Sequence, residues 1–292
     1  GTASSGGGSS SSGGGGAFDA GQLTPGWVAI PPGQFGMGSP VGEPCRDPNT
    51  ETVHFVNLTR GYEMAPMETT QAEFQALMGF NPSNNTTCGT DCPVESVTWH
   101  QAAAYCSALS RQKGYAECYA CDGGVSLDGG KSSADCAVAA GSIYACKGYR
   151  LPTEAEFEMA YRAVTTTAFY NGDLAPGPDG GCASTTDPNA DAIGWHLRNS
   201  NVKIHPVGQK LANGFGLYDL GGNVAEHVHD YYLADLGSSS VTDPVTTSGT
   251  TGVIRGGNFA NPPSAIRGAY RQTDPRTFVG TGIGFRCVRT LP

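Results

Sequence analysis

The stretch that decides the fold runs from Asn213 to Glu226 and reads NGFGLYDLGGNVAE. It places turn-forming glycines between residues with carboxylate side chains, Asp219 and Glu226. Gly222 and Asn223 both tolerate left-handed backbone conformations, so the chain can turn sharply there and direct main-chain carbonyl groups inward. Carboxylate and carbonyl oxygens on a tight loop are the ligands that Ca²⁺ prefers. The stretch therefore predicts a calcium site.

Further motifs lie on both sides of this stretch in a fixed order. Together they resemble the formylglycine-generating-enzyme (sulfatase-modifying-factor) domain over roughly residues 25–292. The resemblance implies an elaborated C-type-lectin-like fold. We therefore expect a loop-rich α+β domain of this FGE-sulfatase type, stapled by disulfides. The matching motifs are GQFGMGS at 33–39, METTQAEF at 67–74, PVESVTW at 93–99 with AAAYC at 102–106, RLPTEAEFE at 150–158, RGGN at 255–258 and GFR at 284–286.

Composition narrows the domain organisation and the partners. The 292 residues include 43 glycines, and residues 1–16 are a Gly/Ser tract that resembles the tethers of bacterial lipoproteins. We expect residues 1–24 to form a Gly/Ser-rich tether or arm and residues 25–292 to form one domain. With 17 basic residues and a formal net charge of −9, the chain is not expected to bind nucleic acid. No apolar run is long enough to cross a membrane.

Ten cysteines in a glycine-rich chain predict disulfides and an oxidising compartment. Cys88 and Cys92 are expected to close a small loop. Four more are expected to staple an insertion at about 112–147, although the Cys118–Cys121 spacing also suits zinc. The last four are left for long-range bridges. The cysteines of the insertion are Cys118, Cys121, Cys136 and Cys146, and the last group is Cys45, Cys106, Cys182 and Cys287.

Hydrophobic spacing and capping residues predict three helices, at 70–78, 98–109 and 153–162. Thr153 with Glu156 three residues later forms a capping-box pattern. First-turn acids such as Glu154 are expected to serve the helix dipole. Residues 165–212 are expected to be irregular. Two strands, 253–255 and 283–289, are expected to close the sheet.

The family resemblance also assigns the ligands of the calcium site. It implies that Asp219 and Glu226 supply side-chain oxygens and that Gly222 and Val224 supply main-chain oxygens. The alternative is that the two acids cap turns or pair with arginines.

The resemblance fails at the catalytic centre. The family's oxygenases bind copper through two cysteines a few residues beyond the RGG strand, because Cu(I) prefers thiolates. Here Asn261 stands at the first position, and Ser264 to Ile266 cover the second. Formylglycine generation is therefore not expected. Iron-dependent relatives use three histidines, and a site at His227 and His229 would lack a clear third ligand.

The region 258–282 matches the ligand-facing stretch of lectin-like members. The arginines of this C-terminal part either contact a ligand or pair with internal acids such as Glu154 and Glu158. The candidate contacts are Asn258, Asn261, Arg267, Tyr270 and Arg271.

These observations predict a calcium-stabilised, non-catalytic protein that is secreted or lipid-tethered at a bacterial cell surface. It would act either as a binding module for a protein or glycan, or as a structural subunit that assembles through its Gly/Ser arm. The alternative is a copper- or iron-dependent oxidoreductase with an altered active site.

Overall fold

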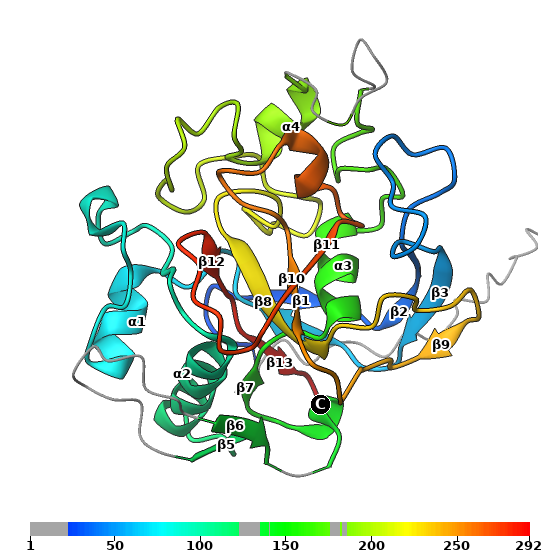
Figure 1. The fold of residues 1–292 in the computed structure, drawn as a ribbon. Coiled ribbons are helices and arrows are strands. Elements are labelled where there is room, and N and C mark those ends of the chain that lie inside the picture. The colour runs from blue at the N-terminus through cyan, green and yellow to red at the C-terminus, as the bar shows by residue number, and fades with distance from the viewer. Residues whose placement is uncertain (1–22, 123–134, 140, 176–181, 183–185) are drawn as a thin grey trace, which may run out of the picture.

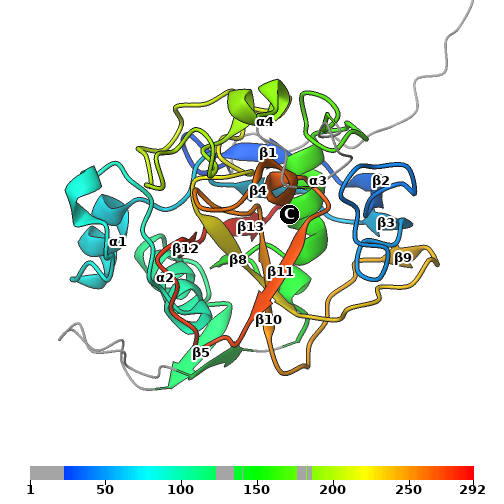
Figure 2. The same ribbon diagram turned by 45° about the horizontal axis from the view of Figure 1, so that its top comes forward.

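The computed structural model describes residues 23–122, 135–139, 141–175, 182 and 186–292. The predicted Gly/Ser arm therefore lies almost wholly outside the described residues. Figures 1 and 2 show short strands and helices joined by long loops. The first and last strands of the described residues, β1 and β13, lie in one sheet. That sheet has the order β1-β4-β13-β7, with bounds Val28–Ile30, Tyr62–Met64, Val288–Thr290 and Tyr149–Arg150.

Three further sheets, of four, three and two strands, complete the described architecture. The second positions the candidate site and has the order β11-β10-β8-β12, with bounds Arg271–Asp274, Gly252–Arg255, Ala225–Tyr231 and Ile283–Gly284. The third has the order β2-β3-β9, with bounds Gly33–Met37, His54–Leu58 and Val241–Thr242. The fourth is the hairpin of β5 (Tyr119–Asp122) and β6 (Asp135–Val138) within the insertion.

The three predicted helices are confirmed: α1 (Gln71–Met78), α2 (Trp99–Gln112) and α3 (Glu154–Arg162). Each begins after a threonine whose hydroxyl accepts the N3 amide, and the N3 side chain accepts the threonine amide in return. Two orphan amides are satisfied at each start, which fixes where these short helices begin. A fourth helix, α4 (Pro188–Ile193), lies in the segment expected to be irregular.

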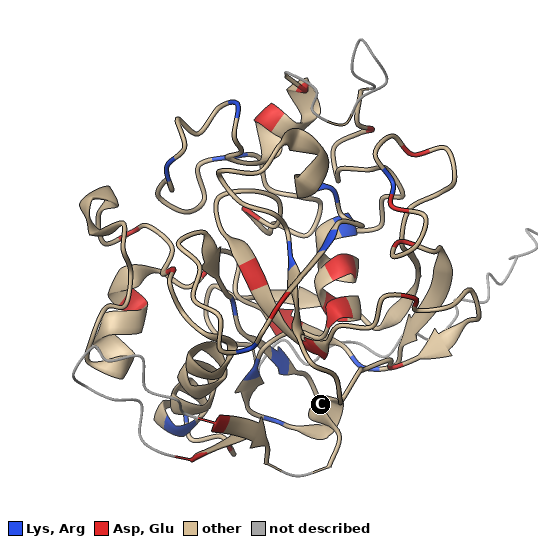
Figure 3. Ribbon diagram, viewed as in Figure 1, with Lys and Arg blue, Asp and Glu red and all other residues tan. Residues whose placement is uncertain are grey.

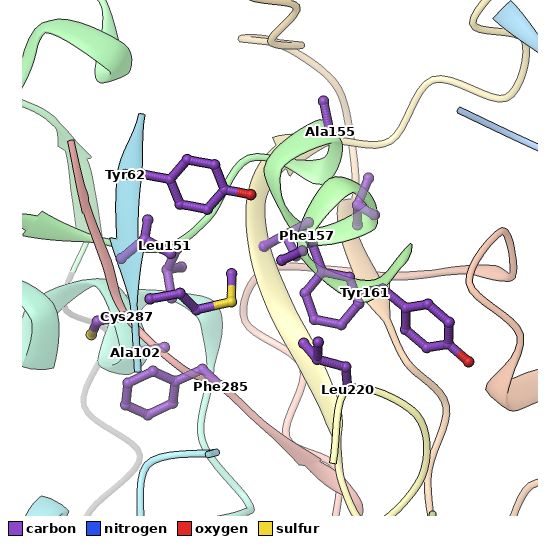
Figure 4. Packing of buried hydrophobic residues seen from close by; sticks show 14 of the residues in the cluster. Tyr62, Ala102, Leu151, Ala155, Phe157, Tyr161, Leu220, Phe285 and Cys287 are labelled. Carbon is purple, nitrogen blue, oxygen red and sulfur yellow. The ribbon is translucent and has the colours of Figure 1, made fainter. Parts of the chain in front are cut away.

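The hydrophobic core lies between α2, α3 and the first two sheets. Figure 4 shows Tyr62 of β4, Phe157 of α3 and Phe285 pointing into it. The Tyr62 hydroxyl donates to the Glu156 carbonyl at 2.6 Å, so even this polar tip is satisfied. Burial of these aromatic rings is the main stabilisation of the described domain.

All ten cysteines form disulfides, and their grouping follows the prediction. Cys88–Cys92 closes a small loop. Cys118–Cys146 and Cys121–Cys136 staple the insertion, which removes the zinc alternative because both sulfurs of the Cys118–Cys121 pair are used. The long-range bridges are Cys45–Cys182 and Cys106–Cys287.

Buried ion pairs form a second internal framework. Figure 3 shows acidic positions on α3 and β8 beside basic positions on neighbouring strands. The alternative in which C-terminal arginines pair with internal acids is what the structure contains: Arg271 binds Glu154 and Arg255 binds Glu158. The other buried pairs are Arg150–Glu156, Arg162–Glu158, Arg267–Glu51, Arg267–Glu43, Arg286–Glu226 and Arg289–Glu63.

The prediction of one strand at 283–289 is wrong. Ile283–Gly284 pairs in parallel with β8, whereas Val288–Thr290 pairs with β4 and β7 in the other sheet. The chain crosses between the sheets at Phe285–Cys287, where Arg286 reaches Glu226 and Cys287 joins Cys106. Within the described residues, no helix is long and apolar enough to span a bilayer.

Candidate functional site

The stretch 213–226 forms a compact turn directly before β8. Asp219, Gly222 and Asn223 have positive φ of 54°, 92° and 56°, so the predicted sharp turn is confirmed. A side chain at Gly222 would put its Cβ 2.6 Å from the Trp195 carbonyl oxygen, which explains the glycine there. Asp219 Oδ2 accepts the Gly208 amide at 2.6 Å, whereas Asp219 Oδ1 is buried with no hydrogen-bond partner.

Glu226 is committed to an arginine. Arg286 donates from Nε and Nη2 to the Glu226 carboxylate at 2.7–3.0 Å, and both side chains are almost fully buried. Glu68, buried beside them, accepts the Val224 amide at 3.2 Å. Burial raises the pKa of Glu68 well above its usual value, and the Asp219 carboxylate adds to the rise.

The residues therefore fit a cation only in part. Asp219 Oδ1 is a buried carboxylate oxygen available to a metal, and three carboxylates face the single Arg286 guanidinium. Both oxygens of Glu226 accept hydrogen bonds from Arg286, which agrees with the alternative prediction that the acids of this stretch pair with arginines. Across the described ranges, no three His, Cys, Asp or Glu side chains are arranged to hold a metal ion. Calcium binding by Asp219, Gly222, Val224 and Glu226 stays a prediction.

The region corresponding to the family's copper site holds a hydrogen-bonded turn. Asn261 Oδ1 accepts the Asn258 amide at 2.9 Å, and Ser264 Oγ donates to the Cys182 carbonyl at 2.8 Å. Ile266 is completely buried. Because every cysteine of the chain is in a disulfide, no thiolate is available here.

Asn223 joins this turn to the loop that follows α4. Its Oδ1 accepts the His205 amide at 3.0 Å, and its carbonyl accepts the Phe259 amide at 2.9 Å. The Leu197 amide donates to the Asn261 carbonyl at 2.8 Å, which links the two loops again. We call the surface formed by residues 195–211 and 258–262 the loop face; it lies near α4 in Figure 1.

The loop face carries aromatic, basic and apolar groups that the sequence analysis did not single out. Trp195 stacks on His205 with ring centroids 3.7 Å apart, and Lys210 Nζ lies 3.9 Å from the Trp195 ring centroid. Val202 and Leu211 are 57% and 53% exposed. The only signal in the sequence was Trp195 itself, in a segment without periodicity.

The five predicted ligand contacts do not form one surface. Asn258 and Asn261 lie together on the loop face and are partly exposed. Arg267 is buried between Glu43 and Glu51, and the Arg271 side chain is buried against Glu154. These two arginines are structural in this arrangement, because a ligand would have to displace their carboxylates. Tyr270 is half-buried beside Arg267.

His227 and His229 lie on one face of β8, yet their nitrogens are directed to different partners. His227 Nε2 lies 3.1 Å from the Val97 carbonyl, and His229 Nδ1 lies 3.0 Å from the Tyr119 hydroxyl. Burial lowers the pKa of His227 to about 4 and that of His229 to about 3. Both rings are therefore neutral hydrogen-bonding groups at physiological pH.

The fold and this site together define a disulfide-stapled α+β domain of the lectin-like class whose copper-site positions lack thiols. The chain belongs to the FGE-sulfatase family: the model of the sulfatase-modifying factor enzyme 1-like domain matches residues 17–291.

Several characterised proteins are similar to this chain. It is 29% identical over 233 residues to the "Chaperone protein LppX" of Paenibacillus barcinonensis, covering 76% of this chain and 78% of that protein. It is 34% identical over 159 residues to the formylglycine-generating enzyme of Mycobacterium tuberculosis, but the match spans only 48% of this chain and 51% of the enzyme. Among solved structures, Treponema denticola variable protein 1 superposes with a TM-score of 0.72 at 28% identity, covering 90% of this chain and 94% of that chain.

Proposed function

We propose that this protein is a non-catalytic, extracellular or cell-surface binding domain whose partner is another polypeptide. The observation that carries the proposal is the turn at Asn258–Asn261. Where the family's oxygenases need two thiolates, this chain has an amide that closes a turn, a serine bonded to a carbonyl and a buried isoleucine. An amide and a hydroxyl do not replace thiolates as Cu(I) ligands.

The loop face is the surface that we assign to the partner. It combines exposed Val202 and Leu211 with the side chains of Trp195, Asn261 and Lys210. Aromatic and amide groups beside apolar ones are typical of protein-binding surfaces. The hydrogen bonds through Asn223 hold both loops in place before binding, which lowers the ordering cost of association.

One comparison supports a polypeptide partner, because a relative that aligns along 78% of its own length is named a chaperone. Five disulfides suit an oxidising extracellular environment. The competing proposal is self-assembly through residues 1–16, in which the polypeptide partner is a second copy of this chain.

We also propose that a Ca²⁺ ion stabilises the 213–226 turn, with Asp219 Oδ1 as its first ligand. A cation there would compensate the excess of three buried carboxylates over one guanidinium. Main-chain oxygens of Gly222 and Val224 complete the proposed set, and Glu226 would have to share its carboxylate with Arg286. The ion would stabilise the loop face and take no part in chemistry.

Metal content decides between the binding domain and the oxidoreductase. The full chain is incubated anaerobically with Cu(I) or Fe(II), desalted and analysed by mass spectrometry, beside a formylglycine-generating enzyme treated identically. We expect the enzyme to retain stoichiometric copper and this chain to retain none. Stoichiometric copper or iron on this chain would contradict the proposal.

The loop face is tested by suppression of aggregation of a chemically unfolded reporter protein, followed by light scattering. We expect the wild-type chain to suppress scattering and the Val202→Asp/Leu211→Asp variant to lose this effect. Val41→Asp, at a 90% exposed position on another loop, is the matched control. Equal suppression by all three would refute the assignment of the face. Electron microscopy of chains with and without residues 1–16 tests self-assembly, since filaments that require the arm would identify a second copy as the partner.

A further inference from the structure

Arg276 is half-buried and differs from the buried arginines in having no carboxylate partner. Seven arginine side chains in the core each bind at least one acid, whereas no carboxylate of the described residues lies within ion-pair distance of Arg276. Its guanidinium lies between two aromatic rings, 3.7 Å from the Trp99 centroid and 3.6 Å from the Tyr231 centroid. The guanidinium carbon is thus in contact with two aromatic rings, and the N–H groups are the part of the cation that can bind a ligand.

The hydrogen-bonding capacity of this guanidinium is only partly used. Nη2 donates to the His229 main-chain carbonyl, and Nε is buried with no acceptor. A guanidinium has five N–H groups, and each one left without an acceptor in a buried place costs free energy. Burial lowers the pKa of Arg276, and the smaller opposing effects come from Tyr231, Tyr119 and the Asp230 carboxylate.

A cavity of about 150 Å³ adjoins this guanidinium. Its walls come from the start of α2, from β6, from the end of β8 and from the segment after β9, and they include no acidic side chain. The lining residues are Trp99, Cys136, Ala137, Val138, His229, Tyr231, Thr246, Thr247 and Arg276. Strand β6, which supplies three of these residues, lies at the end of the molecule opposite α4 in Figure 1.

His229 adds a second donor to the cavity. The Tyr119 hydroxyl accepts the Leu151 amide at 3.2 Å and is 3.0 Å from His229 Nδ1, and we assign the hydroxyl proton to that nitrogen. The neutral imidazole then carries its hydrogen on Nε2. A neutral N–H beside a guanidinium can bind an anion without adding a second positive charge.

We propose that this cavity is a binding site for a small organic carboxylate, held by the guanidinium of Arg276 and the imidazole of His229. The planar carboxylate matches the edge of a guanidinium and can accept two parallel hydrogen bonds. The single positive charge balances one negative charge, which favours a monoanion over phosphate or sulfate dianions. Trp99, Tyr231 and Val138 provide apolar contacts for a short carbon chain, and the volume limits its size.

The site is tested by NMR titration of the full, isotope-labelled chain with sodium acetate and sodium propionate, at ionic strength kept constant with chloride. We expect saturable shifts of the Arg276 Nε–H and His229 ring signals, with millimolar affinity. Arg276→Gln should weaken binding by at least about tenfold. Arg60→Gln removes the same charge from an exposed position paired with Asp243 and should leave binding unchanged.

A second variant separates loss of the site from loss of the fold. Ala137 is exposed on β6 and lines the cavity, so Ala137→Phe should fill it and abolish acetate binding without changing Arg276. Absence of saturable shifts in the wild-type chain, or equal binding by Ala137→Phe, would overturn the proposal. Tighter binding of sulfate or phosphate than of either carboxylate would overturn the assigned ligand class.

Discussion

The two disulfides at the extremes of loop length should contribute very different amounts to stability. Cys106–Cys287 joins residues 181 positions apart and Cys88–Cys92 joins residues 4 apart. Because a crosslink restricts the unfolded chain more as the closed loop grows, the chain-entropy relation gives about 5 kcal/mol for the first and about 2 kcal/mol for the second. The Cys118–Cys146 bridge shortens the first loop by at most 28 residues, which changes the logarithm of the loop length, and so the stabilisation, only slightly.

The comparison uses the paired variants Cys106→Ala/Cys287→Ala and Cys88→Ala/Cys92→Ala, unfolded in guanidinium chloride without reductant and followed by tryptophan fluorescence. We expect the first to lose about 3 kcal/mol more than the second. Since a domain is typically stable by about 5–15 kcal/mol, the first variant should be close to unfolding at 37 °C. Equal losses in the two variants would refute the loop-length argument.

Three further predictions concern charge. Arg286→Met leaves the buried Glu226 carboxylate without a counter-charge and should cost about 3–5 kcal/mol of unfolding free energy, most of it regained in Arg286→Met/Glu226→Gln; no recovery in the double variant would contradict the pairing. Burial lowers the pKa of His229 to about 3, below the value of about 6.5 in the unfolded chain, so the stability that the neutral imidazole contributes is complete above pH 6.5 and is lost as the pH falls. His229→Gln should therefore reduce the dependence of the unfolding free energy on pH by up to about 1.4 kcal/mol per pH unit. Denaturation between pH 4 and 7 measures this slope. Calcium at a hundred times its dissociation constant should stabilise the wild-type chain by about 2.7 kcal/mol and leave Asp219→Ala unchanged in thermal melts with and without EDTA; equal stabilisation of both would place the ion elsewhere.

The helices and the turn before β8 were predictable because local sequence determines them. Thr70, Thr98 and Thr153 each satisfy the first orphan amides of a helix, and such signals depend on only four residues. Helix α4 has only six residues and begins at a proline within a polar segment, so no apolar stripe marked it. The cysteine groups also followed from spacing, although the pairing within each group did not.

The division of 283–289 between two sheets and the particular acids that Arg267 meets were not predictable, because long-range contacts determine them; for Arg271, pairing with Glu154 was one of the two alternatives that the sequence left open. The alternation of IGFRCVR suits one strand, but Cys287 must meet Cys106 while Gly284 must approach Val94, and the chain changes sheets between them. Arg267 and Arg271 meet acids more than a hundred positions earlier in the chain. The loop face depends on Asn223, whose contacts to His205 and Phe259 leave no periodic pattern.

The Cys106–Cys287 bridge also determines how the domain carries a mechanical load. The shortest covalent route from residue 23 to residue 292 follows the chain to Cys106, crosses the disulfide and leaves at Cys287. The Cys45–Cys182 bridge attaches the backbone from 107 to 286 to the same route at residue 45, so tension between the two ends reaches that backbone only as residues 45–106 are drawn apart. The loop face and the Arg276 cavity belong almost entirely to the segment from 107 to 286, so in the oxidised domain a pull on the two ends disturbs these sites only after residues 45–106 begin to extend.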